Sequence, residues 1–325
     1  MLPVLRYVVR RLLQAIPVLI AIAVINFLLV QLAPGDSADV LAGEAGTATP
    51  EYVASLREKF GLDRPVYVRL IHYVSNVARL DFGYSFREGR PVIGLIVDRM
   101  LPTLLLMVVS TLVAVGVGIL LGALSARFAN GPADAVISVL ALLLYATPTF
   151  WIGLMMIVLF SVELGILPSG GMQTLGAARS GFSWSVDVAW HVVQPALALS
   201  LFYLAIYARL TRASMIDAYG EDFVRTAIAK GITRRRVALR HVLPNAILPT
   251  VTMAGVQVGS LLGGAVLVET VFSWPGIGRL AYEAVAHRDF NLLLGILLMT
   301  SAMVILLNLA IDLLYAWLDP RIVMH

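Results

Sequence analysis

The residues that most often carry out chemistry in proteins are few in this chain and lie far apart. Cysteine is absent, which excludes disulfides, thiolate nucleophiles and thiolate metal sites. The motifs HExxH, GxSxG and GxxxxGK[ST] are also absent, and neither Lys59 nor Lys230 stands in a phosphate-binding loop. The five histidines are scattered: His72, His191, His241, His287 and His325. We therefore expect no catalytic, cofactor-binding or metal-ligating residues, and no enzymatic activity.

Recognition of a partner is indicated instead by residues 221–245, EDFVRTAIAKGITRRRVALRHVLPN, a basic segment between two apolar runs. Residues 222–230 permit a short helix, which Gly231 could end in a left-handed conformation. A second helix is expected over 233–242, and Pro244 predicts a break before the next apolar run. Two short helices joined by glycine form a rigid knob. From the residues alone, an amphipathic helix lying on anionic lipid is an equal alternative.

The surrounding elements are those of a membrane protein. The chain of 325 residues is 59% hydrophobic and only 14% charged, with a mean hydropathy of +0.88, which cannot coat a water-soluble domain. Helices are expected because backbone amides in hydrocarbon must be satisfied within their own segment, and a span takes about 20 residues. Six apolar runs are long enough, at 12–32, 101–125, 135–162, 188–208, 246–268 and 290–311. We predict an all-α, polytopic membrane protein with six transmembrane helices.

The distribution of positive charge predicts the orientation. Residues 209–245, between the fourth and fifth runs, contain eight Lys or Arg against three Asp or Glu. Positive residues near span ends stay on the cytoplasmic side. This loop and, after six crossings, both termini are therefore predicted to be cytoplasmic. The net charge of +4 comes mainly from this loop, so membrane orientation accounts for it and nucleic acid is not expected as a partner.

The domain organisation follows from these spans. We predict an N-terminal transmembrane helix at 1–33, an external insertion at 34–100 and a transmembrane core at 101–325. Within the insertion, residues 51–60 and 66–77 are expected to be helical. The first helix is too long for a cleaved secretory signal and is expected to remain as an anchor.

Two features within the spans bear on movement and packing. Pro148 lies inside the third run, where it predicts a kink that could serve as a gate. Gly255, Gly259 and Gly263 recur every four residues in the fifth run and predict close approach of another helix.

Two residues beyond the fifth run are candidates for external contact. Glu269 and Trp274 are expected at the outer end of this span, either as structural anchors or as contacts for a delivery protein. Charges are nearly absent from the middle of the spans. Because ion-coupled carriers need such charges as relays, any transport is expected to draw its energy elsewhere.

The sequence EDFVRTAIAKGI followed by RHVLPNAILP resembles the cytoplasmic loop of permease subunits in binding-protein-dependent ABC importers. Asp222 and Phe223 depart from the Glu-Ala-Ala start of the family pattern, a departure common in its peptide branch. The matching positions are Glu221, Ala227, Gly231, His241 and Pro244.

Further matches extend over nearly the whole chain. VARLDFGYSF, YATPTFWIG, LPSGG, LLGGAVLVETVFSWPGIGRL and DLLYAWLDPRI all resemble dipeptide, oligopeptide and nickel permeases. So does the N-terminal RYVVRRLLQAIPVLIAIAVINFLLVQLAPGD. The chain is most similar to the B-type subunit of dipeptide and oligopeptide permeases.

The resemblance implies a type I importer fold in the bacterial inner membrane and a subunit that forms half of a peptide pathway. It implies as partners a second homologous permease, two ATPase subunits, an external binding protein, the lipid bilayer and a peptide substrate, with no cofactor. Nickel, glutathione or another small solute remains an alternative cargo, and a stand-alone channel or ion-coupled carrier is a distant alternative. The implied ATPase-coupling residues are Glu221, Asp222, Arg225, Ala227, Lys230, Gly231, His241 and Pro244.

Overall fold

A computed structural model describes residues 2–32, 49–59, 63–85, 87–176 and 180–318. The chain divides into two compact units, one of Met1–Leu101 with Arg279–His325 and one of Pro102–Gly278. Helices α5 (Val92–Arg127) and α13 (Ile277–Ala286) each contribute residues to both.

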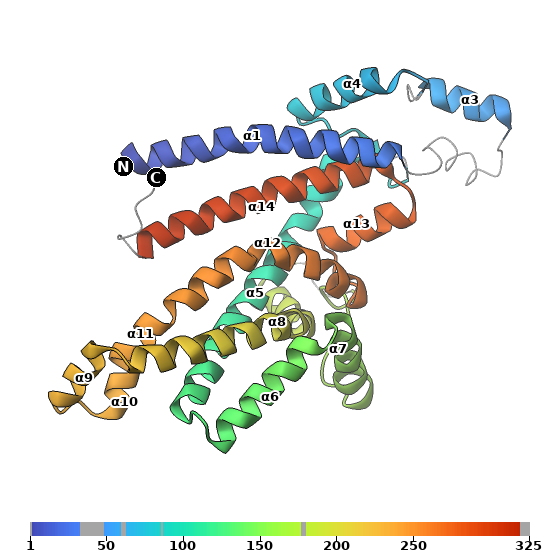
Figure 1. Cartoon of the computed structure of the whole chain (residues 1–325). Helices are drawn as coiled ribbons and strands as arrows, with labels where there is room; N and C mark the ends of the chain where they lie inside the picture. The colour runs from blue at the N-terminus through green and yellow to red at the C-terminus, as the bar shows by residue number, and fades with distance from the viewer. Residues whose placement is uncertain (1, 33–48, 60–62, 86, 177–179, 319–325) are drawn as a thin grey trace. The chain divides into compact units, whose positions relative to one another are not determined.

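The first unit is built on a long helix pair. Helices α1 and α14 lie side by side, and the N-terminal end of α1 lies at the same end of the pair as the C-terminal end of α14 (Figure 1). Helices α3 and α4 confirm the two helices predicted in the insertion. The elements that lie wholly in this unit are α1 (Leu2–Gln31), α3 (Pro50–Lys59), α4 (Val66–Ala78), β1 (Tyr84–Ser85), β2 (Arg90–Pro91) and α14 (Phe290–Leu318), with β1 and β2 antiparallel.

Several contacts fasten the insertion to α1 and to the start of α14. Tyr73 of α4 stacks on Phe27 of α1, with 5.6 Å between the ring centroids. Burial raises the pKa of the Tyr73 phenol to about 12, so the hydroxyl stays protonated at physiological pH. Ser85 donates a hydrogen bond of 2.5 Å to Asp289, just before α14. The insertion is therefore packed onto α1, which precedes it in sequence, and onto the start of α14, which lies far from it in sequence.

The second unit is organised around α8, against which α6, α7 and α12 pack. Many residues of α8 are buried, including Tyr203 and Tyr207. The elements of this unit, besides its part of α5, are α6 (Pro132–Ala146), α7 (Thr149–Met156), the π-helix η1 (Ile157–Glu163), α8 (Phe182–Tyr219), α9 (Asp222–Ala229), α10 (Arg234–Val237), the π-helix η2 (Ala238–Val242), α11 (Leu243–Ala246) and α12 (Leu248–Val271).

The described helices account for the predicted spans, with one correction. Five helical segments are long and apolar enough to cross a membrane: Arg6–Gln31, Val92–Arg127, Phe182–Tyr219, Arg234–Val271 and Phe290–Leu313. The third predicted span is not continuous, because Pro132–Ala146 and Thr149–Glu163 are bent by 103°. Counted as one span, this pair gives six.

The bend has a local cause at Pro148. Proline disfavours the helical conformation of the residue before it and has no N–H to donate. Thr147 is accordingly extended, with φ −86° and ψ 130°, and Pro148 precedes the first turn of α7. The kink predicted from this proline is thus a full break.

Pro244 corrects a second prediction. We expected it to separate the loop helix from the fifth span, but helical structure continues from Arg234 to Val271. The π-helix η2 ends two residues before the proline, and the Leu243 N–H donates to the Ala238 carbonyl, five residues back. A π turn shifts the hydrogen-bond pattern, which allows the helix to pass through a residue that lacks an N–H.

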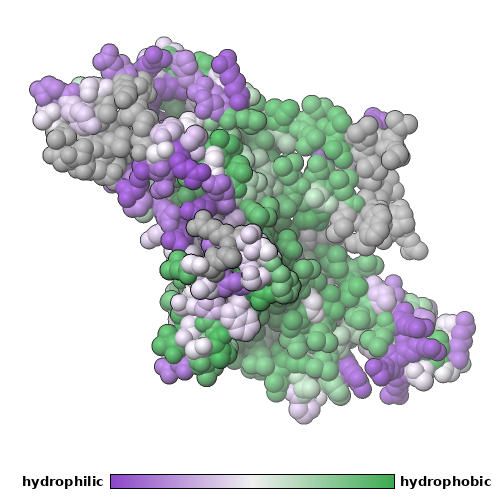
Figure 2. Space-filling view, turned by 180° about the vertical axis from the view of Figure 1, so that it is seen from behind, coloured by the Kyte–Doolittle hydropathy of each residue, from purple (hydrophilic) through white to green (hydrophobic). Residues whose placement is uncertain are grey.

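The surface of the long helices is predominantly hydrophobic, as expected for contact with lipid (Figure 2). Hydrophilic residues gather over α3 and α4 in the first unit and over α9 and α10 in the second.

Candidate coupling site

The segment after α8 folds into the predicted knob. Glu221 has an extended backbone at the start of α9, and Asp222 follows in the first turn, where an acidic side chain favours a helix N-terminus. At the other end Gly231 has φ +75°, its N–H donates to the Ile228 carbonyl, and the Ile232 N–H donates to that of Ala227. These bonds form the glycine-terminated cap that closes a helix.

A buried apolar cluster holds the knob in place. From α9 it takes Val224 and Ala227, which are 2% and 5% exposed. The other members come from the end of α5, the end of α8 and the helical segment from α10 to α11: Ala126, Met215, Ala218, Val237, Val242 and Ala246. We call this set the knob core. Because interiors are close-packed, a displacement of α9 must displace the helix ends that share its core.

The opposite side of the knob is exposed and carries charge. Asp222 and Arg225 form an ion pair of 3.4 Å, but their side chains are 94% and 76% exposed, so the pair contributes little. The exposed cations of the segment outnumber its anions: Arg225, Lys230, Arg234, Arg235, Arg236 and Arg240 against Glu221 and Asp222.

The predicted coupling residues divide between these two sides. Glu221, Asp222, Arg225, Lys230 and Gly231 lie together on the exposed part of the knob. Ala227 belongs to the knob core, so it supports the surface from beneath and does not form part of it. Further along, Pro244 is exposed and His241 is half-buried.

An ion pair beneath the knob was missed by sequence reasoning. Arg212 of α8 donates two hydrogen bonds of 2.7 Å to Asp134 of α6, from Nε to Oδ1 and from Nη2 to Oδ2. The Ser125 hydroxyl donates to the same carboxylate, and so does the Asn130 N–H at 2.8 Å. Asp134 is 4% exposed. Its position in the first turn of an apolar helix, after Gly131 and Pro132, was the available signal.

The Asp134 carboxylate joins the start of α6 to α5 and α8, two helices that also contribute to the knob core. Ser125 precedes Ala126 in α5, and Arg212 lies three residues before Met215 in α8, which is about one helical turn. A buried hydrogen bond of 2.9 Å between Thr211 and Thr250 also ties α8 to α12. Polar contacts therefore reinforce the apolar cluster.

The glycines predicted to pack in the fifth span differ in their surroundings. Gly255 is buried and Gly259 is half-buried. Gly263 is exposed, and a side-chain carbon there would meet nothing within 4 Å. Close packing at Gly263 thus remains a prediction for another subunit.

Glu269 and Trp274 do not lie where a delivery protein could reach them, because both are 0% exposed. The Thr103 hydroxyl donates to Glu269 at 2.7 Å and accepts from the Ile277 N–H at 2.8 Å. The Trp274 indole donates to the Pro102 carbonyl at 3.0 Å. Their polar groups are satisfied inside the unit, so the structural-anchor alternative replaces external contact.

The sequence matches the family described as the inner membrane component of binding-protein-dependent transport systems over residues 118–324, and its N-terminal part over residues 4–107. This chain belongs to that family. It is a multi-pass permease subunit of the inner membrane, and its family works with ATPase subunits and a substrate-binding protein.

Individual relatives agree with this assignment. The permease is 40% identical to the dipeptide transport system permease protein DppB of Escherichia coli (strain K12), over 98% of each chain. It is 41% identical to the glutathione transport system permease protein GsiC of the same strain, over 98% of this chain and 99% of that one. The resemblance found in the sequence is confirmed.

The fold is also that of a solved permease. A chain of the MetNI methionine ABC transporter, in inward-facing conformations, superposes with a TM-score of 0.54 at 18% identity. The match covers 70% of this chain and 97% of that chain. The predicted importer permease fold is therefore confirmed.

Proposed function

We propose that this permease forms half of the pathway by which an ATP-driven importer carries dipeptides and oligopeptides across the bacterial inner membrane. A second, homologous permease subunit supplies the other half. Two ATPase subunits bind on the cytoplasmic side, where residues 209–245 and both termini lie, and an external binding protein delivers the peptide on the side of residues 34–100.

The relatives support a peptide substrate. One transports dipeptides, and the other transports glutathione, which is itself a tripeptide. The same architecture would serve nickel or another small solute. Glutathione is the second candidate, because the identity to that permease is as high as the identity to the dipeptide permease.

Coupling to the ATPases is supported by one observation: α9 buries Val224 and Ala227 in the knob core and exposes its charged residues. In the proposed cycle, closure of the ATPase dimer on ATP moves the knob. The ends of α8 and of the segment leading into α12 move with it, because they share its core. The permease pair then changes from inward-facing to outward-facing, and hydrolysis resets it.

The break at Pro148 is a second proposed moving part. Discontinuous helices in transporters commonly lie near the substrate pathway. Thr147 and Pro148 join two helical pieces at 103°, and the second continues into the π-helix η1. A change in this angle would open or narrow the pathway as the permease pair rocks.

Substrate transport is tested by uptake. Cells with all other peptide importers deleted would be compared with and without this permease, using a labelled tripeptide. We expect accumulation only in the complemented cells, and competition by unlabelled dipeptides. Equal accumulation in both would exclude this tripeptide as cargo, and labelled glutathione would then test the second candidate.

Coupling is tested at Gly231. No atom lies within 4 Å of the position of an added Cβ, so bulk is not excluded there. The backbone of Gly231 has a left-handed φ of +75°, and this conformation costs a β-branched residue about 1–2 kcal/mol. Gly231→Val should therefore loosen the knob, so that the reconstituted importer hydrolyses ATP but transports less peptide per ATP.

Gly231→Asn is the matched control, because asparagine tolerates the left-handed conformation. It should keep most of the coupling. If the valine variant transports as much peptide per ATP as the wild type, the knob does not carry the coupling.

A further inference from the structure

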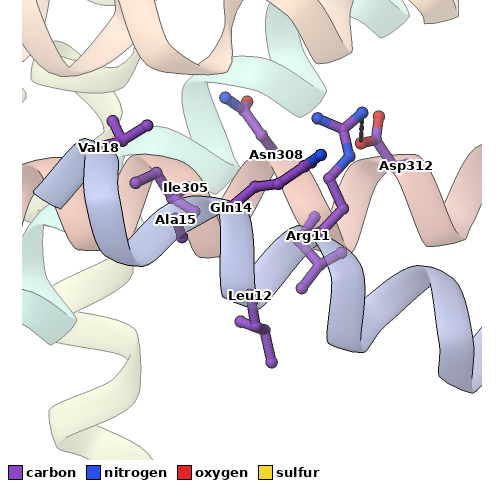
Figure 3. Close-up of a pocket in the computed structure, with 9 residues that line it drawn as sticks. Arg11, Leu12, Gln14, Ala15, Val18, Ile305, Asn308 and Asp312 are labelled. Atoms are coloured by element: carbon purple, nitrogen blue, oxygen red, sulfur yellow. Dashed lines mark ion pairs between the residues drawn. The ribbon is translucent and has the colours of Figure 1, made fainter.

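A polar cavity lies between α1 and α14 within the first unit. Its volume is about 310 Å³, and the polar residues lining it are Arg11, Gln14, Asn308 and Asp312. Figure 3 shows Gln14 from α1 and Asn308 from α14 beside the Arg11–Asp312 ion pair. None of these residues belongs to the proposed coupling surface.

One end of the cavity carries excess positive charge. Arg11 Nη2 lies 3.2 Å from Asp312 Oδ2, and Arg11 Nε donates to the Tyr7 hydroxyl at 3.0 Å. Neither contact uses Nη1, so the guanidinium retains N–H donors for an anion. Arg6 and Arg10 are exposed on the same helix, so the described residues at this end of the helix pair include three arginines and one aspartate.

The two amides are the unusual feature. Gln14 and Asn308 both lie in segments able to span the membrane, and both are exposed. Within the described part of the chain, neither side chain makes a hydrogen bond. An amide that faces hydrocarbon without a partner is costly, so something that accepts hydrogen bonds should cover them.

Their depth identifies the kind of acceptor. Gln14 is three residues from Arg11, and Asn308 is four from Asp312, which corresponds to about 4.5 and 6 Å along each helix. The interfacial layer of a bilayer is roughly 5–8 Å thick on each side. If the charged pair lies at the phosphates, the amides lie near the ester carbonyls of the lipid.

An apolar groove continues from the cavity. It has a volume of about 430 Å³ and shares Leu12, Ala15 and Ile305 with the polar cavity. Its remaining lining, which includes Leu13, Ile16 and Leu306, is entirely aliphatic. Such a groove fits an acyl chain.

We propose that α1 and α14 bind one anionic phospholipid, in the leaflet that holds the N-terminal end of α1. Arg11 donates to its phosphate, Gln14 and Asn308 donate to its ester carbonyls, and an acyl chain occupies the groove. A helix of the partner permease is the competing occupant. The excess of arginine and the adjoining aliphatic groove favour the lipid.

Native mass spectrometry of the whole importer tests this, with phosphatidylglycerol and phosphatidylcholine offered in equal amounts. We expect the wild type to retain phosphatidylglycerol preferentially. Arg11→Gln should reduce its retention about fivefold, the effect of one cation at a membrane surface. The double variant Gln14→Leu with Asn308→Leu should reduce it further while keeping the surface apolar.

Arg6→Gln is the matched control, because it removes one exposed arginine that does not line the cavity, and it should change retention less than Arg11→Gln does. Assembly and ATP hydrolysis should remain normal in every variant. Equal retention of the two lipids, or equal effects of Arg6→Gln and Arg11→Gln, would overturn the proposal.

A photoreactive residue at position 308 separates the two occupants. A product enlarged by the mass of one phospholipid supports the proposal, and a product with the partner permease overturns it.

Discussion

Two segments of the second unit combine charged and apolar residues. The knob, residues 221–245, lies between α8 and α12, and a turn at residues 269–278 follows α12. In the knob, the charges are exposed, together with the apolar Phe223 and Ile228, and only the members of the knob core are buried. In the turn, which we call the anchor turn, the charged Glu269 and the large Trp274 are themselves buried and hydrogen-bonded. The first arrangement suits docking, and the second suits internal support.

This difference shows that a distinctive motif does not by itself indicate a contact surface. The sequence around the anchor turn, VETVFSWPGIG, is as distinctive as that of the knob. Glu269 and Trp274 satisfy their polar groups with Thr103 and the Pro102 carbonyl. The neighbours of such a residue within the chain determine which side chain fits at its position. Substitutions can distinguish a residue that supports the fold from one that contacts a partner.

The largest effect is expected where the ion pair between the buried Asp134 and the half-buried Arg212 is broken beneath the knob. Asp134→Ala leaves the Arg212 guanidinium without its two hydrogen bonds and removes the acceptor for Ser125 and Asn130. Removing one member of a buried pair is strongly destabilising. We expect loss of most of the folded permease, measured by fluorescence-detected gel filtration after heating.

Asp222→Ala is the matched control, because it breaks an aspartate–arginine pair that is exposed to solvent. It should leave the heat resistance of the permease unchanged. Equal losses for the two variants would contradict the distinction between the buried pair and the exposed one.

The next largest effect is expected in the anchor turn. A side-chain carbon at Gly276 would overlap the carboxylate of Glu269, which is fully buried and cannot swing into solvent. Overpacking of a rigid core costs about 1–3 kcal/mol and occasionally more. Gly276→Ala should therefore lower the free energy of unfolding by about 3 kcal/mol. The loss of heat resistance is measured by fluorescence-detected gel filtration, as for Asp134→Ala.

Gly263→Ala is its control, because an added carbon there meets no atom of the described residues within 4 Å. Normal stability is expected for the isolated subunit. A loss of stability only in the assembled importer would show that Gly263 packs against a partner helix, as its spacing from Gly255 and Gly259 predicts.

Much of the fold could be predicted from the sequence, because long apolar runs, basic loops and glycine caps act locally. The six apolar runs and the helix at 222–230 depend on such signals. The break at Pro148 and the continuation through Pro244 could not be distinguished in advance. Both are prolines in apolar surroundings, and only the extended Thr147 and the π turn before Leu243 separate them.

The site was predictable only in part, for a similar reason. Exposed charges of the knob follow from helix periodicity. The Asp134–Arg212 pair joins residues 78 positions apart, and the Thr103–Glu269 bond joins residues 166 apart. Neither pairing has a local signal, because the partners meet only when the helices pack.

A moderate effect is expected inside the knob core. Ala227 is 5% exposed, and the extra carbons of leucine have no room there. Ala227→Leu should cost about 2 kcal/mol and reduce peptide uptake per ATP, because α9 would shift relative to the helix ends that it contacts. Ala229→Leu adds the same volume on an exposed position of α9. If both variants reduce uptake equally, the core of the knob is not what transmits its movement.

The smallest effect on stability, with a specific effect on docking, is expected from the exposed cations. Arg225→Ala and Lys230→Ala remove charge from the outer side of the knob, where both side chains are exposed. Each should leave the heat resistance unchanged and weaken ATPase binding about two- to fivefold, the range for one exposed ion pair.

The difference from wild type should shrink at 1 M salt, where the screening length falls to about 3 Å. Binding of the ATPase to the detergent-solubilised permease at low and high salt measures this directly. A loss of binding that is independent of salt would mean that these residues act through shape or apolar contact, and the contrast between a charged docking surface and a buried anchor would then have to rest on the knob core alone.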